Sequence, residues 1–262
     1  IDEAHCISKW GSDFRREYEL LKELKIHFPN AIISAFTATA DEETRNDINY
    51  KLTSGTGKIF LYGFNRPNLS LAVQQKTNNW KAQLLEFLAN RKNESGIVYC
   101  LSQKLTEQCA EFLQSEGFNA YPFHAGLDRQ VKIDTQDKFM TEDNVVVCAT
   151  IAFGMGIDKA DVRYVAHISL PSSMEAFYQE IGRAGRDSLE ADTLLIFGLQ
   201  DLFQRKRFID MSDAHDSFKI KEHKRLDALI AYCDSATCRR QTLLSYFKET
   251  CEPCGKCDNC LN

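Results

Sequence analysis

Two adjacent acidic residues near the beginning of the sequence have types and spacing suited to metal-assisted hydrolysis. Asp2 and Glu3 lie in the stretch IDEAH, residues 1–5. One carboxylate can hold Mg2+ through water, and its neighbour can orient and activate an attacking water molecule. We therefore predict that Asp2 holds the metal and that Glu3 acts on the water. The alternative is a solvated pair of surface acids, because so short a motif recurs by chance.

Two arginines much further along the chain could complete this chemistry. The segment 179–187 reads QEIGRAGRD and carries Arg183 and Arg186 at the end of a predicted helix. We expect both guanidinium groups to project from one face and to reach one phosphate from the side opposite the acids. Arginines supplied by a second domain stabilise the charge on a transferred phosphoryl group. A structural ion-pair cluster is the alternative, and the neighbouring glycines argue against it because they leave room for a ligand.

A group of cysteines near the end of the sequence has the spacing of a metal site. Cys254, Cys257 and Cys260 follow the pattern C-x2-C-x2-C. A fourth thiolate would complete a closed tetrahedral site for structural zinc, and an iron–sulfur cluster is the alternative. We expect the metal to stabilise a helical platform rather than to take part in chemistry. Three nearby cysteines compete for the fourth position: Cys233, Cys238 and Cys251.

The bulk composition narrows the class of protein. The 262 residues are 44% hydrophobic and 26% charged, and 32 basic against 37 acidic residues leave a net charge of −5. This balance excludes a protein that coats polyanions over its whole surface, but it allows a local basic channel. No apolar run of about 18 residues occurs, so we expect no membrane span. Four cysteines in apolar segments are expected to be free core residues in a reducing compartment: Cys6, Cys100, Cys109 and Cys148.

Alternating strand and helix patterns must position these candidate residues. Strands are predicted at residues 96–100, 120–123, 145–149, 164–168 and 192–197, and helices at about 78–92, 103–116, 128–140 and 173–183. Strands separated by helices of this length predict a parallel α/β sheet with helices on both faces.

The segments on either side of this sheet have a different character. Before it, we predict a short buried strand at 31–36, a helix that starts in the acid-rich segment 41–48, and a connector at 63–68 that marks a domain boundary. After about residue 200 the chain is charged and helical, and 219–232 reads as an amphipathic helix with a basic face. For each lysine on that face, a solvated position is favoured over a contact with nucleic acid.

Six segments occur in an order and spacing that resemble one known family. They read DEAHCIS-W--DFR-EY, TATA, IVYC-S, HAGL, ATIAFGMGIDKADVR and YQEIGRAGRD. Over essentially the whole chain they resemble the RecQ family of ATP-dependent DNA helicases, which implies 3'-5' unwinding of duplex DNA in recombination and repair. The resemblance also implies tandem RecA-like domains, the first one truncated, followed by a small helical zinc-binding domain. The corresponding ranges are 1–63, 64–199 and 200–262.

The resemblance implies roles for individual residues in nucleotide hydrolysis, with ATP, Mg2+ and Zn2+ as cofactors. Thr37 belongs to a motif whose hydroxyls couple the two domains. Whether Asp158 meets the ribose or an arginine stays open, because the family more often has asparagine there. The implied catalytic residues are Asp2, Glu3, His5, Gln179, Arg183 and Arg186. The implied nucleotide contacts are Asp2, Thr37, Gly156, Asp158, Arg183 and Arg186. The implied zinc ligands are Cys238, Cys254, Cys257 and Cys260.

The implied partner is DNA, as single strands and duplex junctions. The loop after the acidic pair carries Trp10, Phe14 and Arg15, whose rings and charge suit contact with single-stranded DNA. Core packing of the two rings is the alternative. His124 and Thr150 are expected at strand ends, where backbone N–H groups and hydroxyls can hold phosphates. The implied location is the bacterial cytoplasm, at the nucleoid, or the nucleus of a eukaryotic cell.

One element that such an enzyme needs is missing from the sequence. No G-x-x-x-x-G-K-[ST] loop occurs to cradle the β- and γ-phosphates, and SGTGKIF at 54–60 has the wrong spacing. We expect the chain to start midway through the first domain and to be inactive as an ATPase on its own. The alternative function is a non-enzymatic, zinc-containing DNA-binding or adaptor relic of a helicase. An RNA helicase of the wider DEAD/DEAH group is disfavoured by the aromatic loop and the cysteines.

Overall fold

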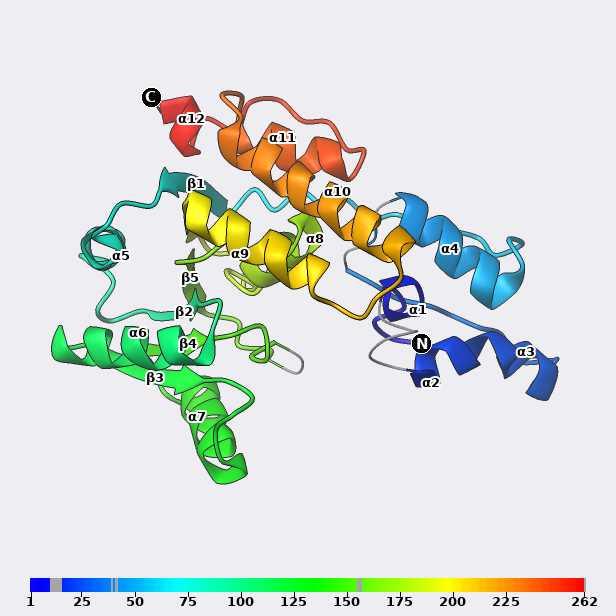
Figure 1. Cartoon of the computed structure of the whole chain (residues 1–262), viewed down its shortest axis with the longest axis horizontal. Helices are drawn as coiled ribbons and strands as arrows, with labels where there is room; N and C mark the ends of the chain where they lie inside the picture. The colour runs from blue at the N-terminus through cyan, green and yellow to red at the C-terminus, as the bar shows by residue number, and fades with distance from the viewer. Residues whose placement is uncertain (10–15, 39, 41, 155–156, 262) are drawn as a thin grey trace.

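A parallel sheet forms the centre of the protein. The computed structural model describes residues 1–9, 16–38, 40, 42–154 and 157–261, apart from the side chains of Lys9 and Arg16. Within these residues the sheet has six parallel strands in the order β1-β6-β5-β2-β4-β3, which confirms the predicted parallel α/β architecture (Figure 1). The strands are β1 (Leu69–Gln75), β2 (Ser95–Tyr99), β3 (Asn119–Phe123), β4 (Val145–Ala149), β5 (Val162–His167) and β6 (Ala191–Phe197).

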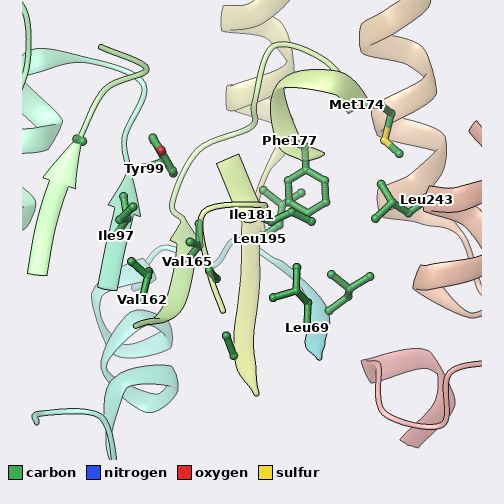
Figure 2. Packing of buried hydrophobic residues seen from close by; sticks show 14 of the residues in the cluster. Leu69, Ile97, Tyr99, Val162, Val165, Met174, Phe177, Ile181, Leu195 and Leu243 are labelled. Carbon is green, nitrogen blue, oxygen red and sulfur yellow. The ribbon is translucent and has the colours of Figure 1, made fainter. Parts of the chain in front are cut away.

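Alternation along the central strands explains why both faces of the sheet are covered. In β2, Ile97 and Tyr99 belong to one hydrophobic cluster, whereas Val98 belongs to another. Successive side chains of a strand point to opposite faces, so a strand buried on both sides is apolar throughout. Figure 2 shows Phe177 and Ile181 packed against the strands in the first cluster. The helices of the second cluster are α5 (Trp80–Leu88) and α6 (Gln103–Ser115), and the first cluster includes residues of α7 (Arg129–Thr141) and α8 (Met174–Ile181).

The edge strand β1 is an element that the sequence pattern did not predict. Its first residues alternate between buried and half-buried positions and its last two are exposed, so its pattern is weak. β6 pairs with one side of β1, and polar groups from the C-terminal helices cover the other side. Val73 N–H donates to Asp258 Oδ2 (3.0 Å), and Ser70 Oγ donates to the carbonyl of Lys256 (3.2 Å). These contacts protect the free edge of the sheet.

The helices that follow the sheet in the sequence pack into the same hydrophobic core as one face of the sheet. They are α9 (Leu199–Asp210), α10 (Asp216–Asp234), α11 (Arg239–Tyr246) and α12 (Asp258–Leu261). Leu226 of α10 and Leu243 of α11 lie in one buried cluster with Leu69 and Leu195 of the sheet. Figure 2 shows Leu243 with Leu69 and Leu195 in this cluster. α10 contains the predicted amphipathic helix, and it runs from α11 toward the N-terminal helices (Figure 1). A single core therefore crosses the domain boundary predicted near residue 200.

The N-terminal segment forms a small hydrophobic cluster of its own. Ala4, Ile7, Ala40, Ile48 and Leu52 are buried there together. The acid-rich segment begins a helix, as predicted. None of the helices in the described part of the chain is both long and apolar enough to cross a bilayer. The N-terminal elements are α1 (Cys6–Lys9), α2 (Arg16–Leu20), the 3-10 helix η1 (Leu21–Glu23), α3 (Leu24–His27) and α4 (Glu42–Thr53).

The prediction of a buried strand at 31–36 is wrong. These residues form no strand, and Ile32 and Phe36 are 93% and 66% exposed. A strand needs a hydrogen-bonded partner along its edge. Among the described residues, the backbone of Phe36 is bonded only to Ile1 and Ala4. With the bond from the Ile1 ammonium to the carbonyl of Ser34 (2.7 Å), three bonds join the N-terminal residues to this run, and they do not extend into a ladder, so the run stays irregular.

Candidate active site and metal centre

A cavity of about 510 Å³ opens where the N-terminal segment faces the sheet. Glu3 and His5 line it from the N-terminal segment, and Gln179, Arg183 and Arg186 line it from the end of α8 and the loop that follows. The cavity lies beyond the carboxyl ends of β2 and β4, and ligands of open α/β sheets bind at this edge. Five predicted catalytic residues therefore meet at one cavity, although the two groups are distant in the chain.

The remaining predicted catalytic residue, Asp2, is not among the residues that line the cavity. Its side chain is exposed, and Oδ1 accepts a hydrogen bond from the Glu3 N–H (2.9 Å). Glu3 has a φ of 48°, which is left-handed, and such a conformation costs on the order of 1–3 kcal/mol in a residue other than glycine. This strained turn separates the two acids, with Asp2 on the surface and Glu3 at the cavity.

His5 joins the acid to a hydroxyl of another motif. Its Nδ1 lies 2.8 Å from Thr37 Oγ1 and 3.3 Å from Glu3 Oε2. His5 is buried, whereas the side chain of Glu3 is 40% exposed and accessible from the cavity. Thr37, which we predicted to contact the nucleotide, therefore belongs to a polar cluster directly behind the acid.

The two arginines are tied to the loop that follows β4. Arg183 Nη1 donates to the carbonyl of Gly154 (2.5 Å), and Arg186 Nη1 donates to the carbonyl of Ile157 (2.9 Å). Arg186 also pairs with the carboxylate of Asp158, which is itself 85% exposed. Of the two partners left open for Asp158, this structure brings it to the arginine.

A buried cluster of aromatic and ionisable side chains joins α8 to the sheet. Tyr99 stacks on His167 with ring centroids 5.1 Å apart, and His167 Nε2 lies 2.7 Å from Glu180 Oε2. The Tyr99 hydroxyl donates to the carbonyl of Phe153 (3.1 Å). Burial raises the pKa of Tyr99 strongly, and nearby Arg183 opposes that effect only in part. The hydroxyl thus stays a donor at neutral pH, and no local spacing in the sequence had indicated this group.

Other cavity-lining residues also escaped the sequence analysis. Arg66 reaches the cavity from the connector, and Arg225 reaches it from α10. Arg225 Nε lies 3.3 Å from Glu175 Oε1, and its side chain is only 14% exposed. By contrast, Lys221 on the same helix is exposed and pairs with Glu43 Oε1 (2.6 Å). The predicted basic face of α10 includes Arg225, but only tertiary packing distinguishes Arg225 from the solvated basic residues of the same helix.

The candidate DNA contacts are described only in part. Trp10, Phe14 and Arg15 lie outside the described residues, as does the predicted nucleotide contact Gly156. His124 and Thr150 directly follow the paired residues Phe123 and Ala149, so the ends of β3 and β4 bring them to the same edge as the cavity. His124 is buried, with Nε2 3.2 Å from Glu107 Oε1. A phosphate at this edge would therefore meet the surrounding backbone and Thr150 before the imidazole.

Four cysteines converge near α11 and α12. The sulfurs of Cys238, Cys254, Cys257 and Cys260 all lie within 4.8 Å of one another. Backbone N–H groups point at two of them: that of Cys254 at Cys238 Sγ (3.3 Å) and that of Arg239 at Cys257 Sγ (3.4 Å). Such bonds stabilise thiolates, and four thiolates with amide donors around them fit a closed zinc site.

The pKa values of individual thiols follow their surroundings. Burial acts to raise the pKa of Cys238, but hydrogen bonds from the amide N–H groups of Cys254 and Gln241 and from the thiols of Cys254 and Cys260 together lower it to about 6. Burial raises the pKa of Cys233 to about 12. Neither Cys233 nor Cys251 joins the group of converging sulfurs in the described part of the chain. The geometry therefore selects Cys238 as the fourth thiol.

Comparisons with known proteins agree with the fold and the metal centre. Residues 80–188 match the helicase conserved C-terminal domain, and residues 199–261 match the RecQ zinc-binding family. Among solved structures, yeast Dbp5 bound to RNA and ADP BeF3 has a TM-score of 0.61 at 19% identity, covering 87% of this chain and 62% of Dbp5. Mycobacterium smegmatis helicase Lhr bound to ssDNA and AMP-PNP has a TM-score of 0.56 at 21% identity, covering 80% of this chain and 30% of Lhr. The class is therefore that of proteins with a RecA-like helicase domain.

The relatives of highest similarity narrow this class to one family. The chain is 43% identical over its whole length to the ATP-dependent DNA helicase RecQ of Haemophilus influenzae, of which it covers 42%. It is 40% identical over its whole length to the ATP-dependent helicase SGS1 of Saccharomyces cerevisiae, of which it covers 18%. Over its whole length the chain is similar to members of the RecQ family, and residues 199–261 match the zinc-binding model of that family. It spans about two fifths of the length of the bacterial relatives.

Proposed function

We propose that this chain forms part of an ATP-dependent DNA helicase that moves 3'-5' along DNA and unwinds duplexes in recombination and repair. The observation that carries the proposal is the convergence of Glu3 and His5 with Gln179, Arg183 and Arg186 at one cavity. The chain contains no G-x-x-x-x-G-K-[ST] loop. We therefore assign the cradle for the β- and γ-phosphates to protein sequence outside this chain, which the length of the relatives allows.

In phosphoryl transfer, the residues of the N-terminal segment act on the water, and those after α8 act on the phosphate charge. Glu3 orients the attacking water, and His5 keeps Glu3 linked to Thr37. Arg183 and Arg186 place positive charge where the γ-phosphate carries its developing charge. Asp2 lies outside the cavity lining, so its exposed carboxylate would hold Mg2+ through water, and the ion would neutralise phosphate charge. Opening and closing of the cavity would couple hydrolysis to movement along DNA.

The metal centre has a structural task in this proposal. Cys238, Cys254, Cys257 and Cys260 would hold Zn2+ as a set of four ligands, which suits a structural ion and not a catalytic one. Asp258, next to a ligand, pairs with Arg239 and accepts the Val73 N–H, so the site is joined to the edge of the sheet.

The proposed partner is DNA, with phosphates meeting the edge of the sheet near His124 and Thr150. Trp10, Phe14 and Arg15 remain the proposed contacts with single-stranded bases. A non-enzymatic adaptor is not favoured, because relatives covering the full chain are named as ATP-dependent DNA helicases and a relic would have no reason to keep acids and arginines at one cavity.

The test uses protein made from the complete reading frame that contains this chain. Glu3→Gln and Arg186→Ala should each lower DNA-stimulated ATP hydrolysis by about 100-fold or more, because each removes charge or water positioning used in the transition state. Binding of single-stranded DNA, measured by fluorescence anisotropy, should change by less than about threefold, because neither residue is among the proposed DNA contacts. A tenfold change would need a loss of about 1.4 kcal/mol.

Two exposed residues of the same types serve as controls. Glu111→Gln on α6 and Arg207→Ala on α9 should leave ATP hydrolysis unchanged. Normal turnover in both Glu3→Gln and Arg186→Ala would contradict the assigned roles. No turnover in the unaltered protein, with nucleotide and DNA both present, would contradict the proposed function itself.

A further inference from the structure

The connector before the sheet is attached to the second half of the molecule. Phe64 N–H donates to Glu249 Oε2 (2.5 Å), and the Tyr178 hydroxyl donates to the carbonyl of Phe64 (2.9 Å). The Phe64 ring also stacks on Phe247, with centroids 4.5 Å apart. From Phe64 onward, the connector is therefore packed against α8 and the C-terminal helices.

Arg66, two residues further on, binds the loop that carries the catalytic arginines. Its Nη1 donates to the carbonyl of Gly182 (3.3 Å), and its Nη2 donates to the carbonyls of Ala184 (2.9 Å) and Gly185 (2.7 Å). These carbonyls belong to residues that flank Arg183 and precede Arg186. Asn68 adds a hydrogen bond to the same carbonyl of Gly185 (2.9 Å).

The end of a helix explains why a cation is placed here. The last carbonyls of a helix have no partner within the helix and carry partial negative charge. α8 ends at Ile181, and the guanidinium of Arg66 binds the carbonyl of the C-cap residue Gly182 and two carbonyls of the loop beyond it. Gly185, with a φ of +57°, lets the loop turn so tightly that an added Cβ would lie 2.5 Å from Asn68 Nδ2. The loop is thus shaped around the side chains of the connector.

We propose that Arg66 is a positioning residue for Arg183 and Arg186. Arg66 lines the cavity, but three of its N–H groups already bind backbone carbonyls of the arginine loop, so we assign its effect on the reaction to the position of that loop. A planar guanidinium with a fixed fork of donors can hold several carbonyls at once, which an ammonium group cannot do with the same geometry. The proposal rests on the proposed function of the cavity.

The test compares Arg66→Gln and Arg66→Lys with Arg91→Lys in protein from the complete reading frame. Arg91 is a half-buried arginine away from the cavity lining, and it pairs with Glu94 and donates to the carbonyl of Phe87. Displacement of catalytic groups by about 1 Å can lower turnover roughly 100-fold. We expect kcat for ATP to fall at least tenfold in both Arg66 variants, with less than threefold change in KM. Arg91→Lys should keep the kcat of the unaltered protein.

A double-variant comparison separates positioning from a general loss of stability. If Arg66 acts through the arginine loop, adding Arg66→Gln to Arg186→Lys should cost less than threefold more in kcat, because variants of one working unit are not additive. Zinc content and melting temperature report whether each variant is folded, and Arg66→Lys decides the outcome if Arg66→Gln does not fold.

Three results would overturn this proposal, and a fourth would contradict the proposed function instead. A kcat within threefold of normal in folded Arg66 variants would overturn the proposal, as would a full, additive loss in the double variant. A rise in KM with normal kcat would also overturn it, because that result assigns Arg66 to nucleotide binding. An unaltered protein without ATPase activity would instead contradict the proposed function.

Discussion

At the residue scale, the metal centre shows how neighbours of one type receive different roles. Cys233 and Cys238 are close in sequence, and both are buried. The sulfur of Cys238 receives an amide hydrogen bond and lies with three other sulfurs, whereas burial raises the pKa of Cys233 to about 12. At neutral pH Cys233 is therefore a protonated thiol in the core, and Cys238 is ready to act as a thiolate.

This difference predicts opposite effects of two matched variants. Cys238→Ser should lower zinc affinity by about tenfold or more, since even changes behind the ligands cost that much. Cys233→Ser should keep one zinc ion per chain, because its sulfur lies outside the cluster. Competition with a coloured zinc chelator measures both affinities. Equal loss of zinc from the two variants would contradict the assignment of Cys238.

At the element scale, the contact between β2 and β5 depends on a glycine. Gly96 pairs with Tyr164 of the neighbouring strand, and the Tyr164 ring lies over the position that a side chain would occupy. A Cβ on residue 96 would lie 2.0 Å from the ring, which is itself fully buried. Neither strand can shift without disturbing the hydrogen bonds that join β5, β2 and β4.

Gly96→Ala should therefore destabilise the protein by about 1–3 kcal/mol or more, as overpacking of a tight core does. Urea unfolding followed by circular dichroism measures the change. Ser95→Ala is the matched control, because it adds no volume and removes a buried hydroxyl that has no partner among the described residues. A Gly96→Ala midpoint equal to that of Ser95→Ala would show that the sheet adapts.

At the scale of the whole molecule, the metal centre and the sheet are parts of one folded unit. Cys257 lies in the same buried cluster as Leu69 and Leu195 of the sheet. Asp258 joins Arg239 to the backbone of Val73 on the edge strand. Loss of zinc should consequently reach the sheet through both apolar packing and hydrogen bonds.

Removal of zinc from the purified chain should lower the melting temperature of the sheet by about 10 °C or more, because binding free energy at such sites is folding free energy. Calorimetry before and after treatment with 1,10-phenanthroline measures the shift, and added zinc should reverse it. Two separate transitions, with that of the sheet unmoved, would show instead that the zinc-binding helices unfold as an independent unit.

Local patterns in the sequence were enough to predict the parallel sheet, the metal site and the motif residues. Apolar runs at 96–100 and 145–149, separated by helical segments, predicted the parallel sheet, because the period of burial is a property of neighbouring residues. The close spacing of Cys254, Cys257 and Cys260 indicated a metal site for the same reason. Motif residues such as Arg183 and Arg186 could be identified because they lie within one short segment.

Only the tertiary structure decided what depends on distant contacts. It placed Glu3 across a cavity from Arg183, chose Cys238 as the fourth thiol, and brought Arg66 to the arginine loop. It also left 31–36 without the partner that a strand needs, and gave β1 an edge protected by the C-terminal helices. The physical reason is common to all of these: hydrogen bonds, packing and thiol convergence between remote segments depend on how the chain returns on itself, which no local period or spacing encodes.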